Sequence, residues 1–243
     1  MISSFSNETY KEFNKLKTKK YSKKYKKCVV ESRKIVAELY ERGLVETIFV
    51  TEDKLSLFKS YKNVKIEVVS SAIAEHMSES VTNDGVLAIC KIPDNNNVQY
   101  NKCIVLDALQ DPSNIGAIIR SAKAFGFTTI FALNSVYPYT FKGVRSSMGH
   151  IFGINYFEVK LDELIRLKDK YNIKFICADM QGKSIDKMAK LNDNFAIIIG
   201  NEGAGVSDEV SSLSDQIISI PMERGVESLN ASVSAGIIMY YLK

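Results

Sequence analysis

From Lys102 onward the sequence alternates between short, continuous apolar runs and helical segments, and this alternation constrains the fold more than any other feature. The runs expected to be strands are Cys103–Leu106, Thr129–Leu133, Ile154–Val159, Ile173–Ala178, Phe195–Ile199 and Gln216–Ile220. The expected helices are Ser113–Phe125, Phe141–Met148, Leu161–Lys170, Ser207–Leu213 and Asn230–Leu242. Apolar strands separated by helices predict an α/β fold, with a parallel sheet covered by helices on both faces. Ligands of such sheets bind beyond the carboxyl ends of the strands.

Residues 1–93 have a different texture and predict a smaller α/β domain. A lysine-rich helix is expected first. The expected strands are Lys26–Val30, Val45–Val50, Val64–Val69 and Val86–Ile92, with a helix at Ser32–Arg42 and a short helix after Val50. Gly43 stands where a helix C-cap is expected. The polar stretch after Pro93 is typical of a linker. We therefore expect an N-terminal domain at 1–93, a linker at 94–101 and a second domain at 102–243.

Composition excludes several classes of protein. With 46% hydrophobic and 25% charged residues, the chain is typical of an ordinary globular protein. No apolar run approaches the roughly 20 residues that a membrane span needs. The first ten residues lack the apolar core of a signal peptide. We therefore expect a cytoplasmic protein with no membrane partner.

Cysteine and histidine usage argues against a metal centre. The cysteines are not at metal-binding spacing, and most lie in apolar runs, which favours small buried hydrophobes. They are Cys28, Cys90, Cys103 and Cys177. His76 and His150 are the two histidines of the chain, and neither sits in a hydrolase motif. We expect no metal ligands and no Ser/His/Asp hydrolase.

Positive charge is concentrated near the N-terminus, although the net charge is only +4. Between Tyr10 and Lys27 a single acid, Glu12, stands among lysines and interleaved aromatic residues. The lysines are Lys11, Lys15, Lys17, Lys19, Lys20, Lys23, Lys24, Lys26 and Lys27. Lysines neutralise phosphates and aromatic faces stack on bases, so Lys19, Lys20, Lys23 and Lys24 are candidate RNA contacts. A solvated helix and loop is the alternative.

The loop after Cys103–Leu106 leads into a helix that can receive an anion. Asp111 can cap this helix, with Pro112 at its first position, and the amides there favour negative charge. Gly116 inside the helix costs roughly 1 kcal/mol relative to alanine, which close packing would explain. Arg120 lies four residues further, on the same face. It can grip an RNA phosphate or pair with a carboxylate at a surface or interface.

Two later loops complete the candidate site. After Phe195–Ile199 the glycines of Gly200–Gly205 have the order G-x-x-G-x-G, which disfavours a dinucleotide-binding Rossmann site. Glu202 is the single acid in this turn and either binds ligand or pins the turn. The loop after Gln216–Ile220 runs to Asn230, where Ser228 or Asn230 can cap a last helix rich in small residues.

Together the three loops resemble the SpoU/TrmH branch of the SPOUT RNA methyltransferases. The matching pieces are Asn114-x-Gly116-Ala117-Ile118-x-Arg120, Ile199-Gly200-Asn201-Glu202-Gly203-x-Gly205, and Ile220-Pro221-Met222 followed by Ser228-Leu229-Asn230-Ala231-Ser232. Each piece is weak alone, but all three stand in this order after strands. The resemblance covers about residues 102–243. The N-terminal part looks like the substrate-binding domain that many members carry.

The resemblance implies an S-adenosylmethionine-dependent methyltransferase acting on the ribose 2′-hydroxyl of structured RNA, most often ribosomal RNA. It also implies a C-terminal trefoil knot and a homodimer whose site is completed by the partner chain. The donor-contact positions that it implies are Gly200, Ile220, Met222, Leu229, Asn230 and Leu133. It implies neither a metal nor a DNA partner.

Arg120 falls at the position that the family uses to activate the ribose hydroxyl. Because a guanidinium stays protonated near neutral pH, we expect Arg120 to bind the adjacent phosphate and stabilise the developing alkoxide. Asn114 and Glu202 are the other candidate catalytic-site residues: Asn114 is expected to shape the site, and Glu202 to hold the second loop or a group of the partner chain. The alternatives are a tRNA 2′-O-methyltransferase of the same family, a catalytically inert RNA-binding module, and a dinucleotide-dependent oxidoreductase.

Overall fold

The computed structural model describes residues 1–80, 84–188, 191, 194–223, 225 and 227–243. The chain forms two compact units. The first comprises Met1–Pro93 together with Tyr137–Phe152, and the second comprises Asp94–Val136 and Gly153–Lys243.

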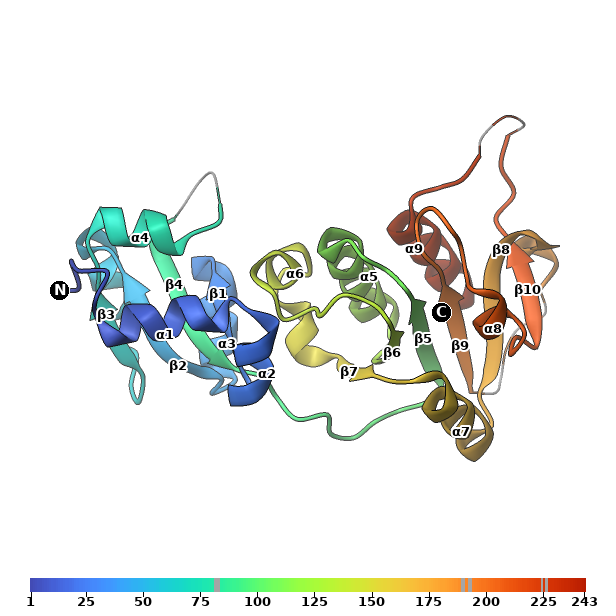
Figure 1. Cartoon of the computed structure of the whole chain (residues 1–243), viewed down its shortest axis with the longest axis horizontal. Coiled ribbons are helices and arrows are strands. Elements are labelled where there is room, and N and C mark those ends of the chain that lie inside the picture. The colour runs from blue at the N-terminus through green and yellow to red at the C-terminus, as the bar shows by residue number, and fades with distance from the viewer. Residues whose placement is uncertain (81–83, 189–190, 192–193, 224, 226) are drawn as a thin grey trace. The chain divides into compact units, whose positions relative to one another are not determined.

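A mixed four-stranded sheet forms the centre of the first unit (Figure 1). Its strands are, in spatial order, β1 (Lys27–Glu31), β4 (Val86–Lys91), β2 (Val45–Val50) and β3 (Lys65–Val68). β4 is antiparallel to both of its neighbours, whereas β2 and β3 are parallel. The helices are α1 (Glu8–Leu16), α2 (Lys19–Tyr25), α3 (Arg33–Glu41), the 3₁₀ helix η1 (Glu52–Phe58) and α4 (Ser71–Met77). The core includes Phe13, Phe49 and Leu87.

Two local features of this unit differ from the sequence-based expectation. The lysine-rich helix is two helices, because the chain breaks at Lys17 and Thr18 before α2 begins. Helix α4 was not expected. It forms because the Ser70 side chain accepts from the Ile73 N–H, and Ile73 and Met77 fill the core.

The segment Tyr137–Phe152 belongs to the first unit although it follows a strand of the second in sequence. It carries α6 (Phe141–Ser146), which contacts β1. Phe141 is buried, and its ring centroid lies 6.4 Å from that of Phe13. The Arg42 guanidinium donates a hydrogen bond to the carbonyl of Phe152. Apolar packing and a charge-assisted hydrogen bond therefore hold this segment in the first unit.

The second unit is built on a six-stranded, all-parallel sheet, which confirms the expected architecture. Its spatial order is β10 (Gln216–Ser219), β8 (Lys174–Ser184), β9 (Phe195–Ile199), β5 (Lys102–Asp107), β6 (Thr129–Leu133) and β7 (Asn155–Glu158). Strands β6 and β9 are buried along their lengths, and β5 is buried from Cys103 onward. Their continuous apolar sequences follow from burial on both faces.

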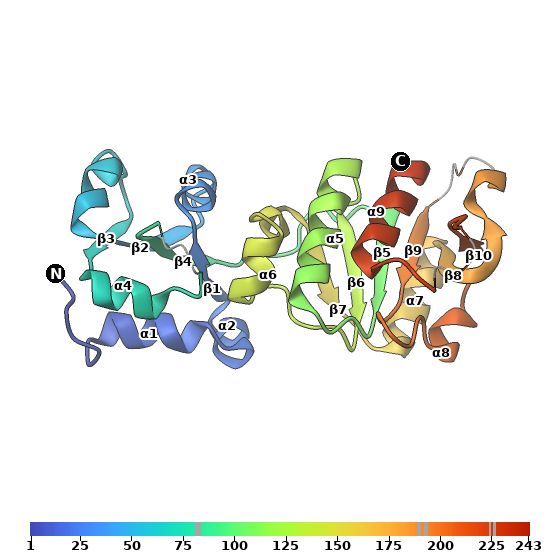
Figure 2. The ribbon, with the colours of Figure 1, turned by 90° about the horizontal axis from the view of Figure 1, so that it is seen from above.

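Helices cover both faces of this sheet. Cys103 and Val105 of β5 share a core with α7 (Leu161–Tyr171) and α8 (Asp208–Ser211). The alternate residues Ile104 and Leu106 are also buried. α5 (Pro112–Phe125) and α9 (Ala231–Leu242) lie side by side in Figures 1 and 2 and contact each other.

Strand β8 extends beyond the expected end at Ala178. Its pairing with β10 jumps from Cys177 opposite Ile217 to Lys183 opposite Ile218, so the residues between form a bulge. A Cβ on Gly182 would lie 2.5 Å from the Ile218 carbonyl carbon, so the two backbones approach at glycine distance. The trefoil knot implied by the resemblance stays a prediction.

Burial agrees with the expected role of the cysteines. All four are free and buried. Burial raises the pKa of the Cys103 thiol to about 12. Among the residues that the structure describes, no helix is long and apolar enough to cross a membrane.

Candidate active site

The loops that follow β9 and β10, together with the bulge of β8, line an open cavity of about 460 Å³. This volume lies in the range of small-molecule sites. The residues of the sequence-predicted site that line it are Gly200, Glu202, Ile220, Met222 and Leu229. Apolar side chains and backbone therefore form much of its wall.

The start of α5 lies next to this cavity. The Asp111 side chain accepts from the Ser113 N–H at 2.9 Å, and Pro112 opens the helix, as the sequence predicted. Asn114 is buried, with only 9% of its surface exposed. Gly116 is buried.

Asn114 joins the first turn of α5 to the loops that precede α8 and α9. Its Nδ2 donates to Oε1 of Glu202 at 2.7 Å, and its Oδ1 accepts from Nδ2 of Asn230 at 3.0 Å. Both partners lie far from it in sequence. The buried Asn114 amide therefore uses one donor and one acceptor to hold the two loops in place.

The loop after β9 is folded by Asn201. Its Oδ1 accepts from the N–H groups of Gly203 and Ala204, and its Nδ2 donates to the carbonyl of Ala108 at 2.9 Å. Backbone hydrogen bonds also join Asn201 and Gly205 in both directions. Asn201 therefore pins the turn, a role that the sequence analysis considered for Glu202. Glu202 instead contacts Asn114.

Glycine is required at the first position of this loop. A Cβ on Gly200 would lie 2.2 Å from the carbonyl carbon of Gly205, closer than real Cβ contacts come. At Gly203 the nearest atom to a Cβ would be Asn201 Oδ1, at 3.7 Å. The sharp turn at Gly200 brings its backbone to the cavity wall.

The loop after β10 leads into α9 through a cap at Asn230. Its Oδ1 accepts from the Ser232 and Val233 N–H groups, so Asn230, and not Ser228, caps the helix. Asn230 therefore holds both α9 and Asn114. Residues 224 and 226 of this loop lie outside the described residues.

The remaining sequence-predicted residues do not line the cavity. Asn230 contacts the site through Asn114. Leu133 is 4% exposed and packs in the core shared with α7 and α8. Arg120 is exposed on α5 and, within the part of the chain that the structure describes, makes no hydrogen bond or ion pair.

Sequence reasoning missed one wall of the cavity, which the bulge of β8 forms. The residues Ala178, Asp179, Met180 and Gln181 line it. The available signal is a polar interruption after an apolar strand, which by itself predicts the end of the strand. Met180 is 60% exposed although apolar, as expected of an open binding surface.

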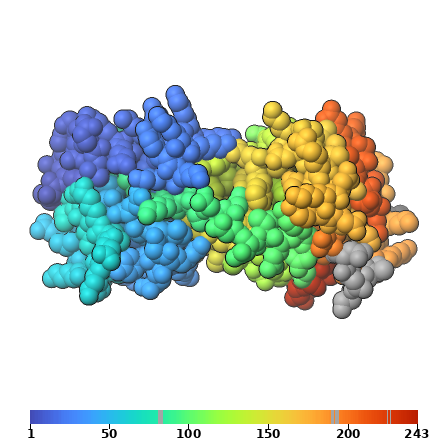
Figure 3. All heavy atoms as spheres, turned by 90° about the horizontal axis from the view of Figure 1, so that it is seen from below, coloured from blue at the N-terminus to red at the C-terminus, as the bar shows by residue number. Residues whose placement is uncertain are grey.

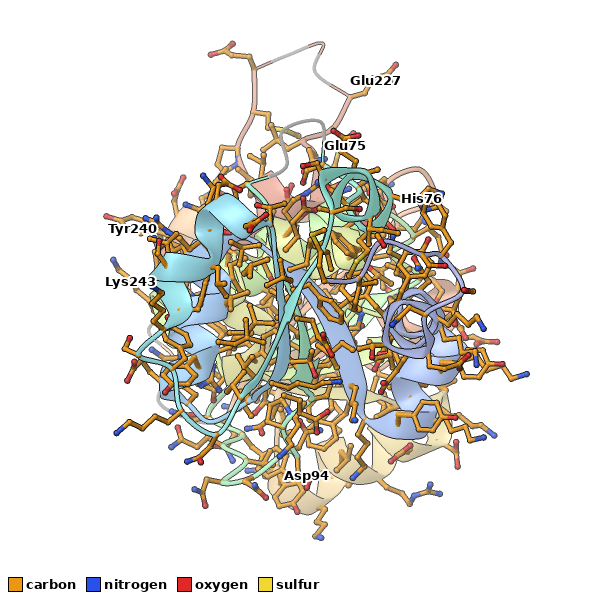
Figure 4. All side chains as sticks on the ribbon, turned by 90° about the vertical axis from the view of Figure 1, so that its left-hand side faces the viewer. Glu75, His76, Asp94, Glu227, Tyr240 and Lys243 are labelled. Carbon is orange, nitrogen blue, oxygen red and sulfur yellow. The ribbon has the colours of Figure 1, made fainter. Side chains whose placement is uncertain are left out.

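The described lining is acidic. Asp179, Glu202 and Glu227 contribute carboxylates, and no lysine or arginine is among the lining residues that the structure describes. Glu227 is exposed on the loop before α9, as Figure 4 shows. The field at this cavity therefore favours a ligand that carries positive charge. Among described residues no His, Cys, Asp or Glu group fit to hold a metal ion occurs.

The N-terminal lysines are not equivalent. Lys11 pairs with Glu8 and Lys27 pairs with Glu46, at 2.7 and 2.6 Å. Burial lowers the pKa of Lys17, whose amine lies 5.4 Å from the Phe141 ring centroid. The candidate RNA contacts Lys19, Lys20, Lys23 and Lys24 are all exposed on α2.

Comparison with known proteins identifies the family. Residues 101–240 match the model of the SpoU rRNA Methylase family, and residues 7–88 match that of the MRM3-like substrate binding domain. The chain belongs to the SpoU rRNA methylase family. It is 28% identical over its whole length to the 23S rRNA (guanosine(2553)-2′-O)-methyltransferase RlmP of Bacillus subtilis, and the alignment covers 98% of that protein.

A second relative is the 23S rRNA (adenosine(1067)-2′-O)-methyltransferase of Streptomyces laurentii, 26% identical over 74% of this chain and 69% of that protein. An AdoMet-bound rRNA methyltransferase from Sinorhizobium meliloti has a similar fold, with a TM-score of 0.88, 20% identity and coverage of 99% and 96%. The AdoMet complex of the SpoU methyltransferase AviRb from Streptomyces viridochromogenes also has a similar fold, with a TM-score of 0.85, 23% identity and coverage of 97% of both chains. At these identities the likeness shows the shared fold.

Proposed function

We propose that this SpoU-family protein transfers the methyl group of S-adenosylmethionine (AdoMet) to a ribose 2′-hydroxyl of ribosomal RNA. The observation that carries the proposal is the hydrogen-bonded series Glu202–Asn114–Asn230. It assembles the three family motifs beside one cavity. Relatives that match over most of the chain are named as 23S rRNA 2′-O-methyltransferases.

The cavity fits the donor in size and in chemistry. Its volume suits a small molecule, and Ile220, Met222 and Leu229 offer apolar contacts. Its acidic lining complements a molecule that carries a sulfonium and an ammonium group. When bound, AdoMet supplies an activated methyl group. The turn at Gly200 would bring backbone groups within reach of the donor.

Arg120 is proposed to act on the RNA and not on the donor. A guanidinium stays protonated, so it can bind a phosphate in bidentate fashion and stabilise negative charge that develops on the ribose oxygen. Its exposure and its absence from the cavity lining agree with this division of roles. Alignment of the hydroxyl with the methyl group supplies much of the remaining rate enhancement.

Arg120 does not line this chain's own cavity, so we propose that it serves the cavity of a partner subunit. Helix α9 supports a homodimer because it leaves a set of large apolar side chains exposed. They are Val233, Ile237, Tyr240 and Tyr241, which are 40–60% exposed. Such a patch is typical of a subunit interface.

The first unit is proposed to bind the RNA substrate. Its N-terminal part matches a substrate-binding domain, and α2 carries the candidate contacts Lys19, Lys20, Lys23 and Lys24. We propose residues 1–93 as the RNA-binding domain, 94–101 as the linker and 102–243 as the methyltransferase domain. An rRNA substrate implies action in the cytoplasm. A tRNA substrate is the second candidate within the family.

The test is incubation with labelled AdoMet and total RNA, followed by nucleoside mass spectrometry of separated rRNA and tRNA. The expected result is one 2′-O-methylated nucleoside in 23S rRNA, lost with Arg120→Ala while AdoMet affinity measured by calorimetry stays unchanged. A label confined to tRNA would support the second candidate. Heat of AdoMet binding without any label in RNA would support an inert module and contradict the proposal.

A further inference from the structure

Helix α2 carries two nearly parallel tyrosine rings, of which Tyr21 is half-buried and Tyr25 is exposed. Tyr21 and Tyr25 stand one turn apart, with ring centroids separated by 6.2 Å and planes inclined by 9°. Tyr25 is 49% exposed. The amine of Lys20 lies 5.7 Å from the centroid of Tyr21, and that of Lys24 lies 5.3 Å from Tyr25. Long side chains project from the blue surface around α2 in Figure 3.

The Tyr21–Tyr25 centroid distance is larger than that of two other tyrosine pairs, in which the rings are in direct contact. The rings of Tyr40 and Tyr61 are 3.8 Å apart, and those of Tyr100 and Tyr171 are 3.7 Å apart. Stacked bases are spaced by about 3.4 Å, so a base inserted between two rings needs roughly 6.8 Å. The Tyr21 and Tyr25 centroids are 6.2 Å apart, so these rings are not in close contact as the other two pairs are, and side-chain rotation at the surface can open the space for one base.

Other residues of α2 anchor this helix within the first unit. Ser22 is 1% exposed and its hydroxyl lies 3.4 Å from that of Tyr137. The amines of Lys19 and Lys23 lie 5.8 and 5.4 Å from the Tyr137 ring centroid. This anchoring reduces the entropy lost when a ligand binds the two rings.

Charge near the two rings suits a nucleic acid. Among the residues that the structure describes, Lys20 and Lys24 form no ion pair. Two ammonium groups therefore flank two aromatic faces at a spacing of one helical turn. Proteins that hold single-stranded nucleic acid combine these elements, stacking faces for bases and cations for phosphates.

We propose that Tyr21 and Tyr25 form a binding site for one unpaired nucleotide of RNA, with the base between the rings and the flanking phosphates on Lys20 and Lys24. This inference rests on the proposed function and adds that the first unit selects a loop or bulge over a continuous duplex. Every base has a stacking face, so the site selects unpaired character and not sequence.

The test measures binding of a fluorescent RNA hairpin and of a blunt RNA duplex by anisotropy. The double variant Tyr21→Leu/Tyr25→Leu is expected to lose about tenfold in affinity for the hairpin, because stacking contributes roughly 1–3 kcal/mol per base, and nothing for the duplex. The matched Phe double variant, which keeps the rings, is expected to bind like wild type. The double variant Lys20→Gln/Lys24→Gln is expected to bind both RNAs more weakly. It is also expected to reduce the slope of log affinity against log salt concentration by about 1.4–1.8.

Tyr171→Leu is the control, because it removes a ring from a closed stack and is expected to leave hairpin binding unchanged. Equal losses on hairpin and duplex, or no loss with the Leu variant, would overturn the site. Methylation of rRNA by the wild-type protein is measured in parallel. If it occurs while the Leu variant binds the hairpin normally, this inference alone fails. If it does not occur, the proposed function fails independently.

Discussion

The side chains of Asn114 and Glu202 share a 2.7 Å hydrogen bond although 88 positions separate them in sequence. Asn114 also accepts from Asn230, so its amide is used on both sides. Any substitution that removes one of these roles leaves a polar partner without its contact. An unmade hydrogen bond of this kind costs about 1–3 kcal/mol.

Asn114→Ala is therefore expected to weaken AdoMet binding about tenfold, because the loops that wall the cavity lose their common anchor. Asn114→Asp is expected to weaken it further, because a carboxylate in place of the Nδ2 donor faces the carboxylate of Glu202. Calorimetry measures the AdoMet affinity of both variants and shows which of the two binds more weakly. If Asp is tolerated better than Ala, the amide does not serve as the donor to Glu202.

Gly200 offers a test of the turn itself. Gly200→Ala places a methyl group 2.2 Å from the Gly205 backbone, so the loop must shift and AdoMet affinity is expected to fall at least about tenfold. Gly203→Ala is the matched control, since its Cβ would find ordinary space in the same loop. Equal affinities for the two variants would show that the position of Gly200 does not matter to the donor.

Much of the second unit was predictable from the sequence. Strands β6 and β9 begin and end at the expected residues, because a strand buried on both faces shows a continuous apolar run. The caps at Asp111 and Asn230 were also predictable, because capping depends on local hydrogen bonds.

Features set by distant contacts were not predictable. The β8 bulge exists because β10 pairs with residues on either side of it, and Asp179 lines the cavity as a result. Segment Tyr137–Phe152 reads as part of the second domain, but the burial of Phe141 places it in the first unit. The Asn114 bridge likewise depends on how three loops meet in space.

Exchange of Arg120 between subunits can be tested by mixing inactive variants. Arg120→Ala removes the guanidinium, and Leu229→Glu blocks the cavity by placing a charge in its wall. In a mixed dimer, an intact cavity on one chain meets an intact Arg120 on the other. Random mixing is expected to restore about a quarter of the wild-type methylation rate. No restoration, with dimers present by light scattering, would show that Arg120 serves its own chain.

The exposed face of α9 gives an independent test of the dimer. Ile237→Glu introduces a charge where 40% of an isoleucine is exposed, and it is expected to shift the protein from dimer to monomer. Ile217→Glu is the control because Ile217 is similarly exposed, at 43%, on β10. Light scattering coupled to size exclusion measures both. A monomeric Ile217→Glu protein with dimeric Ile237→Glu would place the interface on β10.

Asp215 links the start of β8 to β10 and gives the stability of the second unit a pH dependence. Its carboxylate accepts from the Phe175 N–H at 2.7 Å and pairs with Lys168 at 3.0 Å. Partial burial acts to raise the pKa of Asp215, but these two partners outweigh it, so the pKa lies below its ordinary value. A lowered pKa stabilises the fold above the ordinary value, and the contribution is lost as pH falls through the folded-state pKa.

Asp215→Asn is accordingly expected to lower the melting temperature by about 2–4 °C near pH 7, a modest effect because the side chain is partly exposed. The difference from wild type is expected to shrink as the pH falls from about 4 toward the lower pKa of the folded state, because the unfolded chain takes up the proton first and the native carboxylate does so only below its own pKa. Differential scanning fluorimetry across this range measures it, with Asp169→Asn on the exposed side of α7 as the control. A difference that stays constant with pH would show that the Asp215 charge contributes nothing, and that only the shape of the side chain matters.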